Sequence, residues 1–229
     1  MEESKELWPG GLKYAGDAVG TDSLSLAAFA GTVRAGRGCD LGCGSGLLML
    51  LLAWNDPVLS MDGVELRPGA AEQCRGNITA NGLNGRCRVS CGDLRGELLP
   101  AGSMDLVVSN PPYFAAGTGG VSPDGDRALM RTETATLAEL CAAAARLLRP
   151  GGDFCLVHRT ERLPEVLCAL RAEKLEPKEL RFLSASAERA PTLFLCRARR
   201  GAMPGLTMHP PLYQDSAEYR QICHTEEVK

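Results

Sequence analysis

The sequence predicts an α/β fold in which a mostly parallel, seven-stranded sheet is doubly wound with helices. Short apolar runs alternate with longer runs of helical spacing over most of the chain, which is the pattern of a parallel sheet with crossover helices. No helical run separates the last two strand-like runs, so they should pair as an antiparallel hairpin at one edge of the sheet. The chain has 229 residues, of which 45% are hydrophobic and 23% charged, and this is enough for a core without disulfide bonds.

Each predicted strand is a short apolar run that ends near an acid, a glycine or a proline. The strands are expected at residues 38–41, 58–66, 87–91, 104–109, 153–158, 179–183 and 192–197. The helices are expected at 47–54, 68–81, 132–148 and 163–174. The glycine-rich segment 115–128 is expected to form a loop. We divide the chain into an N-terminal extension (1–34), a main domain (35–200) and an irregular tail (201–229).

Composition excludes several classes of protein. The longest purely apolar run, Leu47–Trp54, is far shorter than the roughly 18 residues that a membrane helix needs. The acidic first residues do not resemble an export signal. The ten cysteines are scattered, which predicts free thiols and a location in the reducing cytoplasm. No metal site is expected, because Cys39/Cys43 and Cys87/Cys91 are C-x3-C pairs and not the tighter pairs of most zinc ribbons.

The charge is distributed unevenly along the chain. The net charge is −3, yet residues 146–200 carry 12 basic and 7 acidic side chains. Phosphates respond to the local potential, so a near-neutral protein can still present a basic face to nucleic acid. A basic solvated surface with no partner explains the same pattern, and charge alone favours that explanation.

The segment Asp40–Gly46 is predicted to join the first strand to the first helix. Glycines at 42, 44 and 46 permit a sharp turn and the close approach of a ligand to the main chain. The spacing differs from that of dinucleotide folds, and Asp40 would repel a pyrophosphate but suit a cationic amino group. A tight turn without a ligand is the alternative, because a bare glycine pattern is weak evidence.

Two further acids follow the next two strands. Glu65 ends the second strand, where a carboxylate can accept hydrogen bonds from both ribose hydroxyls. Asp93 follows the third strand, where it can accept one from the amino group of adenine. Chance would not place an acid at three successive strand ends, so with Asp40 they predict a nucleoside-binding groove.

Asn110, Pro111, Pro112 and Tyr113 follow the fourth strand. The two prolines remove two N–H donors. Carbonyl groups and the Asn110 side-chain oxygen could then hold an exocyclic amino group with its lone pair facing a methyl donor. Tyr113 offers a flat face for a base flipped out of its stack. An ordinary turn is the alternative, and it loses weight because the motif follows the three acids.

Together these motifs resemble those of class I S-adenosylmethionine-dependent methyltransferases that modify amino groups. More narrowly, the chain resembles the bacterial tRNA1(Val) adenine-N6 methyltransferase family. The residues that narrow it are 20–22 (Gly-Thr-Asp), 154–163, 175–178 and 210–212. The resemblance implies a single Rossmann-like methyltransferase domain and the cofactor S-adenosyl-L-methionine. It implies as substrate the N6 amino group of an adenine next to the anticodon of a tRNA, in the cytoplasm and with no membrane partner.

The resemblance also implies roles for individual residues. It places Asn110, Pro111, Pro112 and Tyr113 on the target base. The residues that it places around the cofactor are Thr21, Asp22, Asp40, Gly42, Cys43, Gly44, Gly46, Glu65, Leu66, Asp93, Leu94 and Asn110. The candidate substrate contacts are Phe114, His158, Arg159, Arg197 and Arg199. For His158 and Arg159 a structural hydrogen bond or a solvated cap is slightly favoured, and for the two arginines of the last strand an exposed strand end is equally compatible.

Other readings remain open at this point. The same motifs would serve a methyltransferase acting on guanine N2 of rRNA, on DNA adenine or on a protein glutamine. A protein of another class, which binds the cofactor and RNA without catalysis, would also keep the fold. The oligomeric state, monomer or homodimer, is open as well.

Overall fold

The computed structural model describes residues 5–7, 11–16, 19–111 and 135–223. Its centre is a sheet in the order β10-β8-β9-β7-β6-β3-β4-β5, with β11 paired to β8. The seven main strands are those expected from the sequence, with ends that differ by a few residues. They are β3 (Arg37–Leu41), β4 (Ser60–Glu65), β5 (Cys87–Cys91), β6 (Met104–Ser109), β7 (Leu148–Arg159), β8 (Leu175–Ser184) and β9 (Leu193–Arg200).

The strand directions agree with the prediction. β5, β4, β3, β6 and β7 are parallel neighbours. β9 runs antiparallel to both β7 and β8, so the last two main strands form the expected hairpin. In register, Leu156 of β7 lies opposite Ser109 of β6 on one side and Cys196 of β9 on the other.

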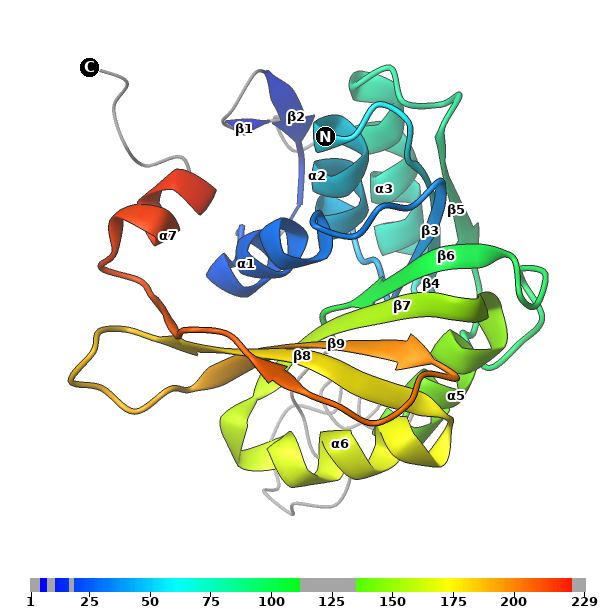
Figure 1. The fold of residues 1–229 in the computed structure, drawn as a ribbon. Helices are drawn as coiled ribbons and strands as arrows, with labels where there is room; N and C mark the ends of the chain where they lie inside the picture. Colours follow the sequence, from blue (N-terminus) through cyan, green and yellow to red (C-terminus); the bar gives the residue numbers. More distant parts are fainter. Residues whose placement is uncertain (1–4, 8–10, 17–18, 112–134, 224–229) are drawn as a thin grey trace, which may run out of the picture.

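Helices cover both faces of the sheet. One face carries α1 (Thr21–Ala30), α2 (Leu47–Asn55) and α3 (Pro68–Ala80), and the other carries α5 (Leu137–Leu147) and α6 (Leu163–Ala172) (Figure 1). Period-two alternation divides the side chains of β7 between two cores. In β7, Cys155 and Val157 join the core under α1 and α2, whereas Phe154 and Leu156 join the core over α5 and α6.

Three regions contain more structure than the sequence predicts. The N-terminal extension holds a small hairpin of β1 (Lys5–Leu7) and β2 (Leu12–Tyr14), and the helix α1. A short 3-10 turn (Thr160–Arg162) precedes α6. The tail expected to be irregular adds β10 (Thr207–Met208) and β11 (Leu212–Tyr213) parallel to β8, followed by α7 (Ala217–Ile222). The tail and the extension also meet each other, because α7 packs beside α1 (Figure 1). Tyr219 of α7 is buried in the core that includes Leu26 of α1.

No helix in the described ranges is long and apolar enough to cross a membrane. The ten cysteines are all free thiols. Within the same ranges, no group of three or more histidine, cysteine or acidic side chains could hold a metal ion.

Candidate active site

Four polar side chains singled out in the sequence come to one edge of the sheet. Asp40, Glu65, Asp93 and Asn110 end or follow β3, β4, β5 and β6. These strands are parallel neighbours, so their carboxyl ends share one edge. β4 and β5 lie on one side of β3 and β6 lies on the other. The strand order therefore reverses between β3 and β6, which is where open α/β sheets bind their ligands.

The turn between β3 and α2 has a backbone that only glycine adopts easily. Gly42, Gly44 and Gly46 have φ values of 75°, 56° and 90°. The Gly42 N–H donates to the Val64 carbonyl of β4 at 2.8 Å, which fixes the turn against the next strand. Among the residues that the structure describes, a Cβ atom added at Gly42 or Gly44 would meet nothing within 4 Å. Their outer side is therefore open to a ligand that approaches the main chain.

Asp40 is the most deeply buried acid of the site, with 2% of its surface exposed. The Met49 N–H in the first turn of α2 donates to its carboxylate, but Oδ2 has no hydrogen-bond partner among the described residues. Burial raises the pKa of Asp40 to about 7, and the nearby charge of Glu65 acts in the same direction. A cationic amino group nearby would favour the ionised form, so Asp40 fits the ammonium end of S-adenosylmethionine.

Glu65 ties the glycine turn to the end of β4. Its Oε2 accepts from the Gly44 N–H at 2.8 Å, and its Oε1 accepts from the Arg67 N–H at 3.0 Å and from Arg67 Nε at 3.1 Å. Only 5% of the residue is exposed. A carboxylate offers about four lone-pair sites, so Glu65 retains capacity for ribose hydroxyls. The following Leu66 is 41% exposed and gives the site an apolar flank.

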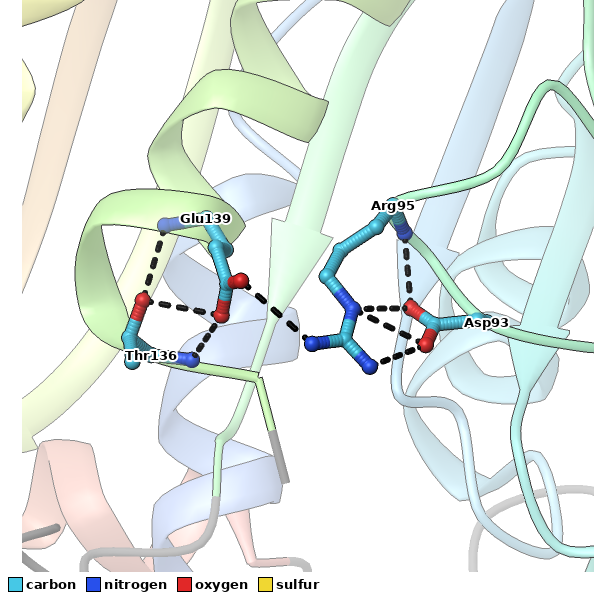
Figure 2. A network of polar contacts seen from close by, with 4 residues as sticks. All are labelled: Asp93, Arg95, Thr136 and Glu139. Atoms are coloured by element: carbon cyan, nitrogen blue, oxygen red, sulfur yellow. Dashed lines mark hydrogen bonds and ion pairs between the residues drawn. The ribbon is translucent and has the colours of Figure 1, made fainter. Parts of the chain in front are cut away.

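Asp93 is already held by an arginine that the sequence analysis did not single out. Arg95 donates to Asp93 from its main-chain N–H and from Nε, each at 2.9 Å, and also from Nη2, while Nη1 reaches Glu139 of α5 at 3.4 Å (Figure 2). Glu139 forms a capping box with Thr136 at the start of α5. The Arg95 guanidinium holds the pKa of Asp93 below its ordinary value. An adenine amino group at Asp93 would therefore share the carboxylate with Arg95.

The end of β6, at Ser109 and Asn110, is hydrogen-bonded to two other elements of the fold. Its side-chain Nδ2 donates to Ser23 Oγ in the first turn of α1 at 3.0 Å. The preceding Ser109, which is fully buried, donates from Oγ to the Leu41 carbonyl of β3 at 2.8 Å. The contact with Ser23 brings the start of α1 to this edge of the sheet, and with it the neighbouring Thr21 and Asp22.

The remaining residues of the Asn-Pro-Pro-Tyr motif are only partly described. Pro111 is half-buried. Pro112, Tyr113, Phe114 and the loop 115–128 lie outside the described residues. Two other cofactor candidates also follow strand ends. Cys43, after β3, is buried, and Leu94, after β5, is half-buried.

His158 lies at the same edge, at the end of β7, but inside the protein. It is 4% exposed, its Nδ1 accepts from the Arg159 N–H at 2.9 Å, and its ring stacks on Phe194 with centroids 6.5 Å apart. Burial lowers the pKa of His158, which favours the neutral ring. These contacts indicate a structural role. Arg159 is exposed, with Glu161 at 3.8 Å.

The two arginines of β9 are held in ion pairs with the neighbouring strands. Arg197 forms an ion pair with Glu179 of β8, and Arg199 with Asp153 of β7 at 2.9 Å. Because β9 runs antiparallel to β7, Arg199 lies opposite Asp153 of β7, which is level with Leu106 near the start of β6. Arg197 lies opposite Cys155, level with Val108 of β6 and Asp40 of β3. Contact between Arg199 and a substrate at Asn110 would therefore need RNA that also reaches the amino edge of the sheet.

The fold and this edge define the class of protein. The family model of the methyltransferase small domain matches residues 19–170, which include Asp40, Glu65, Asp93 and Asn110. The chain belongs to this family of methyltransferases.

Within that class, the chain is similar to proteins named tRNA1(Val) (adenine(37)-N6)-methyltransferase. The relative from Aeromonas hydrophila is 41% identical over 66% of this chain and 63% of its own, and that from Porphyromonas gingivalis 36% over 65% and 61%. The relative from Parabacteroides distasonis is 33% identical over 77% of this chain and 74% of its own. The chain thus spans somewhat over three fifths of the length of the first two relatives.

Solved structures share the fold. A "predicted O-methyltransferase" from Agrobacterium tumefaciens has a TM-score of 0.73 at 19% identity, over 89% of this chain and 95% of that one. Geranyl diphosphate methyltransferase in complex with SAM has a TM-score of 0.57 at 15% identity, over 77% and 85%. These likenesses confirm the predicted Rossmann-like methyltransferase fold.

Proposed function

We propose that this protein transfers a methyl group from S-adenosyl-L-methionine to the exocyclic N6 amino group of an adenine in tRNA, next to the anticodon. The observation that carries the proposal is the position of Asn110 beside the glycine turn, where the strand order reverses. The relatives named tRNA1(Val) (adenine(37)-N6)-methyltransferase support the choice of tRNA and of adenine.

Each acid of the edge has a part in holding the cofactor, which supplies an electrophilic methyl group on a sulfonium when bound. Asp40 faces the ammonium, and the main chain at Gly42 and Gly44 lies along the methionine portion. Glu65 accepts from the ribose hydroxyls, and Asp93, oriented by Arg95, accepts from the amino group of the cofactor's adenine ring. This assignment is supported by the space beside the two glycines and by Asp40 Oδ2, which lacks a hydrogen-bond partner within the described ranges.

Asn110 and Pro111 act on the substrate. The carboxamide oxygen of Asn110 and main-chain carbonyls accept hydrogen bonds from the base amino group and turn its nitrogen lone pair toward the methyl group. As the nitrogen bonds the methyl carbon, the bond from that carbon to the sulfonium sulfur would break and leave a neutral thioether. No strong base is required, because the amino nitrogen becomes acidic as it gains the methyl group and its proton leaves to water. Positioning and exclusion of water then supply most of the rate.

The reaction is placed in the cytoplasm. The ten free thiols, most of them buried, are compatible with a reducing compartment. That compartment also holds the RNA substrate.

The test is methyl transfer from labelled S-adenosylmethionine into tRNA that lacks the modification, followed by nucleoside analysis. Wild-type protein should give N6-methyladenosine. Asn110→Ala should lower turnover by about 100-fold or more, because the acceptor for the amino group is gone. The Kd for the cofactor should stay within about threefold, since Asn110 is assigned to the base.

Three results would count against the proposal. Near-normal turnover of Asn110→Ala would refute the assigned mechanism. A labelled N2-methylguanosine, or label in DNA or in a protein glutamine, would change the substrate. Cofactor binding with no transfer to any of these acceptors would identify a catalytically silent protein.

A further inference from the structure

We propose that Ser23 is a positioning residue for the reaction, because it fixes the orientation of the Asn110 carboxamide. This inference rests on the proposed function for its effect on catalysis. The contact itself, Asn110 Nδ2 donating to Ser23 Oγ at 3.0 Å, is present in the described structure. The two residues lie 87 positions apart in the chain, so the fold and not the local sequence brings them together.

Both ends of the contact are anchored. The Ser23 N–H donates to Asp22 Oδ1 at 2.8 Å. In the same turn of α1, Ser25 donates from Oγ to the Thr21 carbonyl at 2.7 Å. On the other side, the Ser109 hydroxyl fixes the main chain immediately before Asn110 to β3. The contact with Ser23 Oγ then fixes the NH2 end of the Asn110 side chain.

The orientation matters because the two ends of a carboxamide are chemical opposites. Its oxygen accepts hydrogen bonds and its NH2 donates them. A base amino group needs an acceptor, and a carboxamide turned the other way would present it with a second donor. When the NH2 is held by Ser23, the oxygen is directed away from α1. Neither Ser23 nor Asn110 is fully exposed, so water competes only partly for the same contact.

Kinetics of Ser23→Ala test the catalytic consequence. We expect kcat for methyl transfer to fall about tenfold, the scale of one well-formed hydrogen bond. The Kd for S-adenosylmethionine and the KM for tRNA should stay within about twofold, because the residue touches neither directly. Ser23→Thr keeps the hydroxyl and should restore most of kcat. Thr32→Ala removes a hydroxyl beyond the other end of α1, where it bonds the Phe29 carbonyl, and serves as the matched control.

A double-mutant cycle identifies the partner. In an Asn110→Ala background no carboxamide remains for Ser23 to orient, so Ser23→Ala should cause no further loss of kcat. A loss of cofactor affinity that parallels the loss of kcat would instead show that Ser23 only supports the fold of α1, and would overturn the proposal. Unchanged kcat in Ser23→Ala would overturn it equally.

A spectroscopic readout separates this proposal from the proposed function. In a spectrum of 15N-labelled side-chain amides, the NH2 pair of Asn110 is the one lost in Asn110→Asp. Ser23→Ala should shift that pair, whereas Thr32→Ala should not. A pair that does not move refutes the contact, whatever RNA the protein methylates. If the pair moves but wild type forms no N6-methyladenosine, the proposed function fails and the Ser23–Asn110 contact stands.

Discussion

At the scale of single residues, the site keeps an acid in an environment that disfavours its charge. Asp40 is buried at the end of β3, and burial raises its pKa from 3.8 to about 7. Because the folded state holds this proton more tightly than the unfolded state, the contribution of Asp40 to stability is fully present below about pH 4. It is lost as the pH rises toward about 7. The arrangement is therefore suited to a cationic ligand, which would compensate the charge.

Asp40→Asn should remove this loss of stability at higher pH, because an asparagine side chain does not ionise. In urea denaturation of the protein without cofactor, we expect the free energy of unfolding of the variant to exceed that of wild type by more at pH 8 than at pH 5. Asp105→Asn is the control of opposite sign. Burial acts to raise the pKa of Asp105, but hydrogen bonds from the N–H groups of Arg37 and Gly36 and the charge of Arg149 hold it below its ordinary value. That variant should be destabilised at pH 8, and a common pH response of both variants would contradict the assignment.

At the same scale, the hydrogen-bond acceptors of the site can be predicted from the sequence more readily than the side chains that bind and orient them. Asp40, Glu65 and Asn110 could be predicted because each is a polar residue at the end of an apolar run. Ser23 could not, because its contact with Asn110 spans 87 positions and depends on the packing of α1. Arg95 had a local signal, since it stands two residues after Asp93. The excess of basic residues in 146–200 overstates the positive charge available to a ligand, because a count of charges does not reveal their ion pairs.

At the scale of elements, the turn from β3 into α2 is constrained in two different ways. Gly46 has a φ of 90°, and a Cβ atom added there would lie 2.6 Å from Cys74 Sγ of α3. Gly82, after α3, has a φ of 66°, but a Cβ atom added there would meet none of the described residues within 4 Å. Helix α2 therefore needs glycine at its start both for backbone conformation and for close packing against α3.

Gly46→Ala and Gly82→Ala separate the two effects. Gly82→Ala should cost about 1 kcal/mol of unfolding free energy from backbone strain alone. Gly46→Ala should cost about 2–4 kcal/mol, because overpacking is added to the strain. In a Cys74→Ala background the cost of Gly46→Ala should fall toward that of Gly82→Ala. Equal costs in the two backgrounds would show that the thiol yields freely and that strain alone accounts for the glycine.

The elements themselves were predictable to different degrees. The seven main strands and four helices follow from apolar runs and their spacing, and β5 and β6 agree with the prediction at both ends. Helix α1 has Thr, Asp and Ser in its first turn, residues that also favour turns, and its cap Gly20 forms no side-chain hydrogen bond. β10 and β11 have two residues each and exist only through their pairing with β8, so no local pattern could reveal them.

At the scale of the whole molecule, ion pairs neutralise much of the positive charge that the composition of residues 146–200 indicates. Seven of the basic residues in 146–200 form ion pairs in the structure: Arg149, Arg159, Arg162, Arg171, Arg181, Arg197 and Arg199. An arginine that keeps its ion pair when RNA binds does not neutralise a phosphate, and it therefore releases few counterions from the RNA. The proposed tRNA complex should therefore rely on a small number of phosphate contacts near the carboxyl edge of the sheet.

The salt dependence of tRNA binding tests this view of the surface. Between about 50 and 200 mM salt we expect the affinity to fall by less than about 100-fold, against the roughly 10³–10⁵-fold fall of proteins with six to ten phosphate contacts. Arg159→Ala should reduce the slope of log K against log [salt] by about 1, because Arg159 is exposed at the carboxyl edge and its ion pair with the exposed Glu161, at 3.8 Å, is loose enough to give way to a phosphate. Arg199→Ala should leave the slope unchanged, because Arg199 pairs with Asp153 at the opposite edge. A reduced slope in Arg199→Ala would mean that tRNA extends across the sheet to its amino edge, and that the ion pair opens to admit a phosphate.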